Sequence, residues 1–212
     1  MIDLYSWTTP NGRKVAIMLE ELGIDYNAKK IDITNKEQFS EPFLKLSPNN
    51  KIPAIVDNET GVTLMESCAI LLYLSEKYKK FLPQGVERIR AIEWLFWQTS
   101  GLGPILGQVH HFTKFNKGIS DYSEKRYHDE ALRLYSVLDK RLEGRDYIVG
   151  ENKGEYSIAD IACWPWISRF DFQEIDLKSF SNVCSWYLRM VDRPAVQKGY
   201  MVPHYVNDIP LP

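Results

Sequence analysis

Apolar and polar residues follow two different spacings over the first 80 positions, which predicts strands and helices in alternation. Ile2 and Leu4 stand two residues apart, as in a short strand that ends at Ser6. A helix then begins with Thr9 as its N-cap and Pro10 as its first residue. Its apolar positions are Val15, Ile17, Met18, Leu19 and Leu22, and Gly23 ends it.

The pattern from residue 26 to residue 78 predicts five further elements. Strands are expected over 26–33, 52–56 and 62–65, and helices over 39–46 and 66–78. Residues 58–61 (NETG) make the turn between the last two strands. Pro53 cannot donate a hydrogen bond to a sheet, so it must lie at the start of its strand or follow a cis peptide bond. The predicted order is β-α-β-α-β-β-α.

Beyond residue 85 helical spacing dominates and strand signals are scarce. Ile89, Ile92, Leu95 and Phe96 are predicted to form the apolar face of a long helix, which residues 101–104 (GLGP) bend or break. Helices are also expected over 122–142, 180–191 and 194–201. Ser157 and Asp160 form a capping box at the start of another helix. The pattern therefore predicts an α/β domain followed by an all-α domain.

Composition and charge narrow the functional classes. The chain has 212 residues, 44% hydrophobic and 25% charged, with a net charge of −2, typical of a globular protein. This charge favours neither nucleic acid nor an anionic membrane as a partner. Three separated cysteines without a CxxC pair predict no zinc knuckle, no dithiol motif and a reducing compartment. With no signal-peptide pattern at the start, we expect a cytoplasmic protein.

Three motifs in order resemble the cytosolic glutathione transferases. They are residues 50–54 (NKIPA), 65–67 (MES) before an apolar helix, and 157–160 (SIAD). The segments 8–12 (TTPNG), 94–98 (WLFWQ) and 107–112 (GQVHHF) are similar to the nu class of bacterial enzymes, and a fungal regulatory protein shares this relationship. The resemblance covers the whole chain. It implies a thioredoxin-like domain over 1–83 and an all-helical domain over 87–212, in a homodimer.

The predicted helix start at Thr9 occupies the place where a thioredoxin carries its CxxC motif. Without a cysteine here, the protein would use the thiol of glutathione. Helix-start N–H groups and the side chains of Thr9 and Asn11 would stabilise the thiolate, which is the reactive form. Tyr5 and Ser6 remain alternatives of the tyrosine and serine type. They rank lower, because Tyr5 belongs to a strand face and Ser6 precedes the helix start.

The resemblance also implies contacts along the glutathione molecule. The backbone of Ile52 would pair with the cysteinyl segment, and Lys51 and Gln38 would bind the glycyl carboxylate. Ser67 would bind the γ-glutamyl carboxylate at a helix start, and Glu66 would pair with the ammonium group.

Arg126 would reach the glutathione of the other subunit, with Arg133 two turns further along the same helix. Adjacent His110 and His111 point to different sides of a helix and lack acidic or cysteine partners at ligand spacing, so no metal is expected. Cys68 lies in an apolar helix and is expected to be buried and inert.

Three functions follow from this interpretation. The first is glutathione-dependent reduction of a small disulfide, in which a bound thiolate attacks and a second glutathione resolves the mixed disulfide. The second is conjugation of glutathione to a soft electrophile. The third is a non-catalytic regulator that binds glutathione. Disulfide reduction is favoured, because no residue of strong proton-transfer character stands at the predicted site and because the motifs resemble those of the nu class.

Overall fold

The computed structural model describes all residues 1–212, and their contacts divide the chain into two units. One unit comprises Met1–Leu82 and Val191–Ile209, and the other comprises Pro83–Met190 and Pro210–Pro212. The segment 191–209 thus belongs to the first unit, where α9 packs on α1, although the sequence interpretation places it in the helical domain. The predicted domain bounds 1–83 and 87–212 therefore stay a prediction that rests on the family resemblance.

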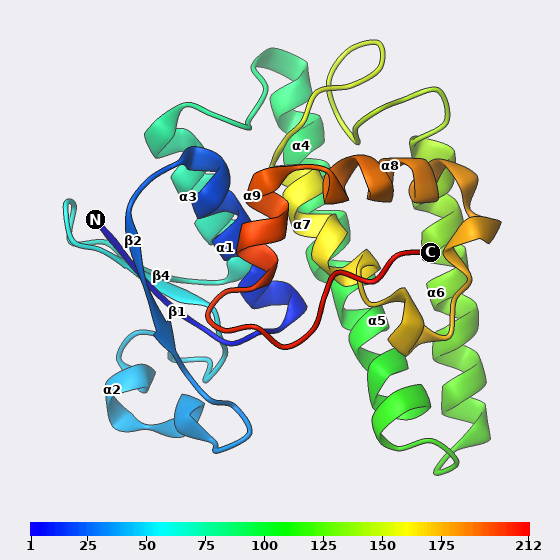
Figure 1. The fold of residues 1–212 in the computed structure, drawn as a ribbon, viewed down its shortest axis with the longest axis horizontal. Helices are drawn as coiled ribbons and strands as arrows, with labels where there is room; N and C mark the ends of the chain where they lie inside the picture. The colour runs from blue at the N-terminus through cyan, green and yellow to red at the C-terminus, as the bar shows by residue number, and fades with distance from the viewer. The chain divides into compact units, whose positions relative to one another are not determined.

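The first unit is built on a mixed four-stranded sheet with the order β2-β1-β3-β4 (Figure 1). The strands are β1 (Ile2–Ser6), β2 (Tyr26–Lys30), β3 (Ala54–Asp57) and β4 (Thr63–Met65). β1 pairs with β2 in parallel and with β3 antiparallel. β2 ends at Lys30 because its partner ends at Ser6, so the predicted strand 26–33 was three residues too long.

The helices of this unit are α1 (Pro10–Leu22), α2 (Glu41–Leu44), α3 (Ser67–Tyr78) and α9 (Pro194–Tyr200). The predicted order of elements over residues 1–78 is confirmed. The single helix predicted over 39–46 is wrong, because a 3₁₀ turn at Glu37–Phe39 and α2 are separated by the extended Ser40. Pro42 lies in the first turn of α2, where its missing N–H costs nothing; in the middle of a longer helix it would clash with the preceding turn.

Helix α1 lies between α3 and α9 and is the centre of the first unit (Figure 1). Its N-cap Thr9, its first residue Pro10 and its left-handed terminal residue Gly23 confirm the predicted bounds. The run from Gly12 to Leu19 is buried without interruption, because α1 is covered on both sides. This burial includes two basic residues, Arg13 and Lys14.

The second unit is helical. Its helices are α4 (Gly85–Trp97), α5 (Gly103–Val109), α6 (Asp121–Arg141), α7 (Ile158–Ile167) and α8 (Ser181–Val191). The predicted break at 101–104 appears as a π-helical segment, Gln98–Leu102, between α4 and α5. The predicted apolar face of α4 was only partly right. Leu95 is buried, but Ile89 and Phe96 are 61% and 69% exposed, because the smaller Ala91 faces the core instead.

None of the helices combines the length and the apolar character that spanning a lipid bilayer requires.

Candidate functional site

The start of α1 forms one wall of the candidate site. Thr9 is extended and caps the helix, and its Oγ1 accepts a hydrogen bond from the Gly12 amide at 3.3 Å. The Thr9 hydroxyl proton therefore remains available to another acceptor. Asn11 follows in the first turn. Because α1 has no acidic residue in this turn, the positive end of its dipole is not neutralised locally.

A cavity of about 240 Å³ gathers five of the predicted site residues. Its walls come from three places: the start of α1, the loop before β3, and the junction between β4 and α3. The lining residues are Asn11, Ser47, Lys51, Ile52, Pro53, Met65, Glu66 and Ser67. Thr9 and Gln38 do not line it. The fold thus brings together segments that lie more than 50 residues apart in the sequence.

The loop before β3 offers backbone groups at the edge of this cavity. The Ile52–Pro53 peptide bond is cis, which is one of the two arrangements that the sequence allowed for Pro53. Ile52 makes no backbone hydrogen bond within the chain, so its N–H and C=O are both available for an extended ligand. Ser47 Oγ donates to the Lys51 carbonyl at 2.7 Å and fixes the loop on its buried side.

The junction between β4 and α3 presents a carboxylate and a hydroxyl next to each other. Glu66 is exposed, and its φ of 70° lies in the left-handed region that side chains other than glycine rarely adopt. Such a conformation costs on the order of 1–3 kcal/mol. Ser67 begins α3 and is 8% exposed, so its hydroxyl reaches only the cavity and its protein neighbours.

Lys14 belongs to this site and was missed by the sequence analysis. It is 2% exposed, and its Nζ donates to Ser67 Oγ at 3.2 Å and contacts Cys68 Sγ at 3.8 Å. In sequence it reads as an ordinary polar position of an amphipathic helix. Only the burial of α1 between α3 and α9 reveals an internal ammonium group. The only sign of this buried charge in the sequence was the pair of basic residues, Arg13 and Lys14, near the start of a helix.

Other predicted residues lie apart from the cavity. Gln38 is half-buried in the 3₁₀ turn, and its Oε1 is buried without a hydrogen-bond partner. The Tyr5 hydroxyl accepts a hydrogen bond from Lys29 at 3.3 Å on the exposed strand face, as strand alternation predicts. Ser6 is fully buried and its Oγ donates to the Trp7 carbonyl at 3.3 Å.

Cys68 is half-buried rather than buried, because it turns toward Lys14 at the start of α3 instead of into the apolar core.

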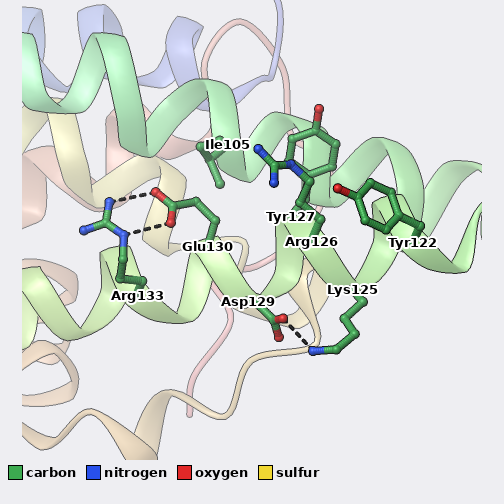
Figure 2. A pocket seen from close by; sticks show the side chains of 8 residues that line it. All are labelled: Ile105, Tyr122, Lys125, Arg126, Tyr127, Asp129, Glu130 and Arg133. Carbon is green, nitrogen blue, oxygen red and sulfur yellow. Dashed lines mark hydrogen bonds and ion pairs between the residues drawn. The ribbon is translucent and has the colours of Figure 1, made fainter.

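The second unit holds a cavity of about 680 Å³ along α6, lined in part by Arg126 and Arg133 (Figure 2). Arg133 donates two hydrogen bonds to Glu130, both at 2.7 Å, as the dashed lines in Figure 2 mark. Arg126 is exposed and makes no hydrogen bond within the chain. Of the two arginines, Arg126 therefore has the guanidinium available to an anion.

The two adjacent histidines have different environments. His110 is buried and stacks on Trp166, with ring centroids 5.7 Å apart, whereas His111 is exposed and packs against Phe112. The Gln173 amide group donates to the Trp166 carbonyl and to His110 Nε2, which must therefore be an acceptor in a neutral ring. Burial and the charge of Arg169 lower the pKa of His110 to about 4. No group of three His, Cys, Asp or Glu residues in the structure could hold a metal ion.

Two family models match the chain. Residues 1–76 match the N-terminal domain of glutathione S-transferases, and residues 103–194 match their C-terminal domain.

Individual proteins are similar over almost the full length. The disulfide-bond oxidoreductase YfcG of Escherichia coli is 49% identical over 95% of each chain. A glutathione transferase family member from Pseudomonas fluorescens, solved with two glutathione molecules bound, is 41% identical with a TM-score of 0.90, over 95% of this chain and 93% of that one. A glutathione transferase from Pseudomonas putida, solved with one glutathione disulfide bound per subunit, is 41% identical with a TM-score of 0.87, over 95% and 91%. These matches confirm the family and the fold that the sequence motifs predict.

Proposed function

The chain belongs to the glutathione S-transferase family, and from this premise we propose that it is a glutathione-dependent enzyme that reduces small disulfides. The observation that carries the proposal is the cavity of the first unit, which joins the start of α1 to Lys51, Ile52, Glu66 and Ser67. Two relatives are named disulfide-bond oxidoreductases, and the two solved structures above hold two glutathione molecules and glutathione disulfide, which favours disulfide chemistry over conjugation.

Each part of glutathione has a partner of suitable chemistry in this proposal. Ser67 and the start of α3 bind the γ-glutamyl carboxylate, and Glu66 pairs with the adjacent ammonium group. The free N–H and C=O of Ile52 pair with the cysteinyl backbone, as an added strand would. Lys51 binds the glycyl carboxylate, and Gln38, which does not line the cavity, is a further contact through its amide group in this proposal. Thr9 and Asn11 then face the sulfur.

The proposed reaction needs no thiol or proton-transfer group from the protein. The bound thiolate attacks one sulfur of the disulfide, forms a mixed disulfide with glutathione, and releases the other half as a thiolate. A second glutathione thiolate attacks the glutathione sulfur of the mixed disulfide. Two glutathione molecules are thereby oxidised to glutathione disulfide, and one disulfide is reduced to two thiols. Donors at the start of α1 lower the free energy of the attacking thiolate.

Compartment and assembly are part of the proposal. Three cysteines, none of them in a disulfide, support a reducing, cytoplasmic location. Exposed Ile89 and Phe96 on α4 and Tyr122 on α6 support a homodimer, because a second copy would cover these apolar side chains. The unpaired guanidinium of Arg126 would then bind the glutathione of the partner subunit.

The proposed binding site is tested by Ser67→Ala with Ser75→Ala as the matched control. Both serines are buried in α3, but Ser75 donates to the Leu72 carbonyl and does not line the cavity. A hydrogen bond to a charged group contributes about 1.5–3 kcal/mol, so calorimetric titration should give roughly tenfold or greater loss of glutathione affinity for Ser67→Ala. The control should bind as the parent does. Equal affinity of both variants, with both folded, would remove the assignment.

The reaction is tested by comparing a small aliphatic disulfide with an aryl halide as co-substrates. We expect glutathione-dependent reduction of the disulfide to be the faster reaction by at least tenfold. Faster conjugation of the aryl halide would assign the second function. Tight glutathione binding without either activity would assign the regulatory one.

A further inference from the structure

Lys14 occupies an unusual position for a lysine. It is 2% exposed in the second turn of α1 and does not line the cavity, but its Nζ lies 3.2 Å from the Oγ of Ser67, which is a lining residue. Burying an ammonium group costs several kcal/mol unless its surroundings compensate. A methionine or leucine would fill the same space without this cost. The protein thus keeps a basic side chain that is separated from the cavity only by the hydroxyl group of Ser67.

The direction of this hydrogen bond determines what Ser67 can do. An ammonium group has only donors, so Ser67 Oγ must be the acceptor. Ser67 Oγ makes no other hydrogen bond in the structure, and its own proton is therefore left for a group in the cavity. A hydroxyl held in this way is a donor to the ligand, and the charge behind it strengthens the bond it donates. The best partner for such a donor is an anion.

The charges around Ser67 are arranged in a definite order. Lys14 supplies a positive charge behind the hydroxyl, and α3, twelve residues long, begins at Ser67 with the positive end of its dipole. Glu66, the preceding residue, carries an exposed carboxylate on the lining of the same cavity. A cationic side and an anionic side next to each other fit a zwitterion, such as the α-amino and α-carboxylate groups of an amino acid.

From this arrangement we propose that Lys14 is a positioning residue that makes the site selective for the α-carboxylate of the γ-glutamyl group, by holding Ser67 as a donor and by supplying the opposite charge. The inference rests on the proposed function, in which glutathione binds in this cavity. Lys14 acts through Ser67 and does not touch the ligand.

The test compares glutathione with γ-aminobutyryl-cysteinyl-glycine, which lacks only the α-carboxylate and keeps the amine that Glu66 would bind. The parent should bind glutathione at least thirtyfold more tightly than this analogue. In Lys14→Met this ratio should fall about tenfold, because glutathione affinity drops while the affinity for the analogue stays within about twofold. Lys14→Arg, which keeps the charge, should restore the ratio to within about threefold of the parent.

Arg13→Met provides the matched control. Arg13 is the neighbouring buried cation of α1, but its Nε donates to the Tyr200 carbonyl on α9, away from the cavity. Arg13→Met measures the general effect of removing a buried charge from α1. The ratio of the affinities for glutathione and the analogue should not change in this variant. If Lys14→Met does not fold, Lys14→Gln measures the same ratio with a neutral side chain that still donates to Ser67.

The possible results separate this inference from the proposed function. If the parent binds neither ligand, or binds both equally, the glutathione site itself is misplaced. If the parent discriminates but the neutral variants weaken both ligands by the same factor, the site stands and Lys14 is only structural. If Arg13→Met changes the ratio as much as Lys14→Met does, the effect comes from the packing of α1, and the inference is overturned.

Discussion

At the scale of single residues, the start of α1 decides how a thiolate would be stabilised. Tyr5 and Ser6, the hydroxyls of the alternative mechanisms, are both engaged elsewhere. The Tyr5 hydroxyl bonds Lys29 on the strand face, and the Ser6 hydroxyl bonds the Trp7 carbonyl inside the unit. A methyl group on Gly12 would overlap Ser6 Oγ and the Trp7 carbonyl oxygen, which means that α1 leaves no free space above Ser6.

Activity should therefore depend on Thr9 and Asn11 and not on Tyr5 and Ser6. Thr9→Ala and Asn11→Ala should each slow glutathione-dependent reduction of a small disulfide by roughly tenfold to a hundredfold, at about 1.4 kcal/mol per tenfold. Tyr5→Phe and Ser6→Ala should stay within a few-fold of the parent.

Thr9→Ala also removes a helix cap worth about 1 kcal/mol, so thermal unfolding is measured beside the rate. Loss of activity in Tyr5→Phe or Ser6→Ala, with Thr9 and Asn11 tolerant of alanine, would contradict the proposed thiolate stabilisation.

At the scale of elements, the crossing of α9 over α1 holds the first unit together. Arg13 lies over the Tyr200 ring, 3.4 Å from its centroid, and Arg193 makes two hydrogen bonds to Glu21, at 2.6 and 2.9 Å. Gly199 stands where the two backbones approach. A Cβ atom at this position would lie 2.6 Å from both Cα and N of Ile17.

Gly199→Ala should therefore destabilise the protein, although alanine is normally the better helix former by about 1 kcal/mol. Since backbone atoms cannot rotate away, α9 must shift, and overpacking of this kind costs about 1–3 kcal/mol. Gly101→Ala is the control, because its Cβ would meet only Leu134 at an ordinary 3.8 Å. Urea unfolding should show a lower midpoint for Gly199→Ala alone. Equal midpoints for the two variants would disprove a close crossing.

At the scale of the whole molecule, the exposed apolar side chains of α4 and α6 support the proposed homodimer. Ile89, Phe96 and Tyr122 are more than 60% exposed, and a second copy packed over them would remove apolar surface from water.

Sedimentation at micromolar concentration should give a mass of about twice 24.7 kDa. Phe96→Asp, which would bury a charge in the interface, should shift the protein toward monomer, whereas Leu211→Asp near the end of the chain should not. Arg126→Ala should leave the dimer intact and weaken glutathione binding. A parent that sediments as a monomer would count against both the dimer and the role of Arg126.

Stability of the whole fold should depend on pH through His110. Its pKa is lowered to about 4 in the folded protein, against about 6.5 in the unfolded chain. Between these values only the unfolded chain takes up the proton, so the contribution of His110 to stability is present above pH 6.5 and is lost as the pH falls to 4. The full loss is on the order of 3 kcal/mol, at about 1.4 kcal/mol per pKa unit.

Asp160 acts in the opposite direction, since burial raises its pKa to about 6. Comparison of the parent with His110→Gln isolates the histidine. The free energy of unfolding should fall less steeply between pH 6.5 and 4.5 in the variant than in the parent. Parallel curves would show that His110 is not held neutral.

The sequence determined the elements and the family because both are encoded locally. Helix caps such as Thr9, Gly23 and the Ser157–Asp160 box act within one turn, and strand and helix spacing are read over a few residues. The motifs around Ile52, Ser67 and Asp160 are likewise continuous segments. These short-range signals were sufficient to predict the β-α-β-α-β-β-α order, the helical second part and most of the residues that line the cavity.

Tertiary structure alone decided which of these residues face one another. The exposure of Ile89 and Phe96 could not be predicted, because the helix periodicity does not say which apolar stripe meets the core. The pairing of Arg133 with Glu130, which leaves Arg126 available, depends on side-chain geometry. The position of Lys14 behind Ser67 joins residues 53 positions apart through the packing of α1 on α3. Burial and long-range contact are properties of the folded chain, and local pattern does not contain them.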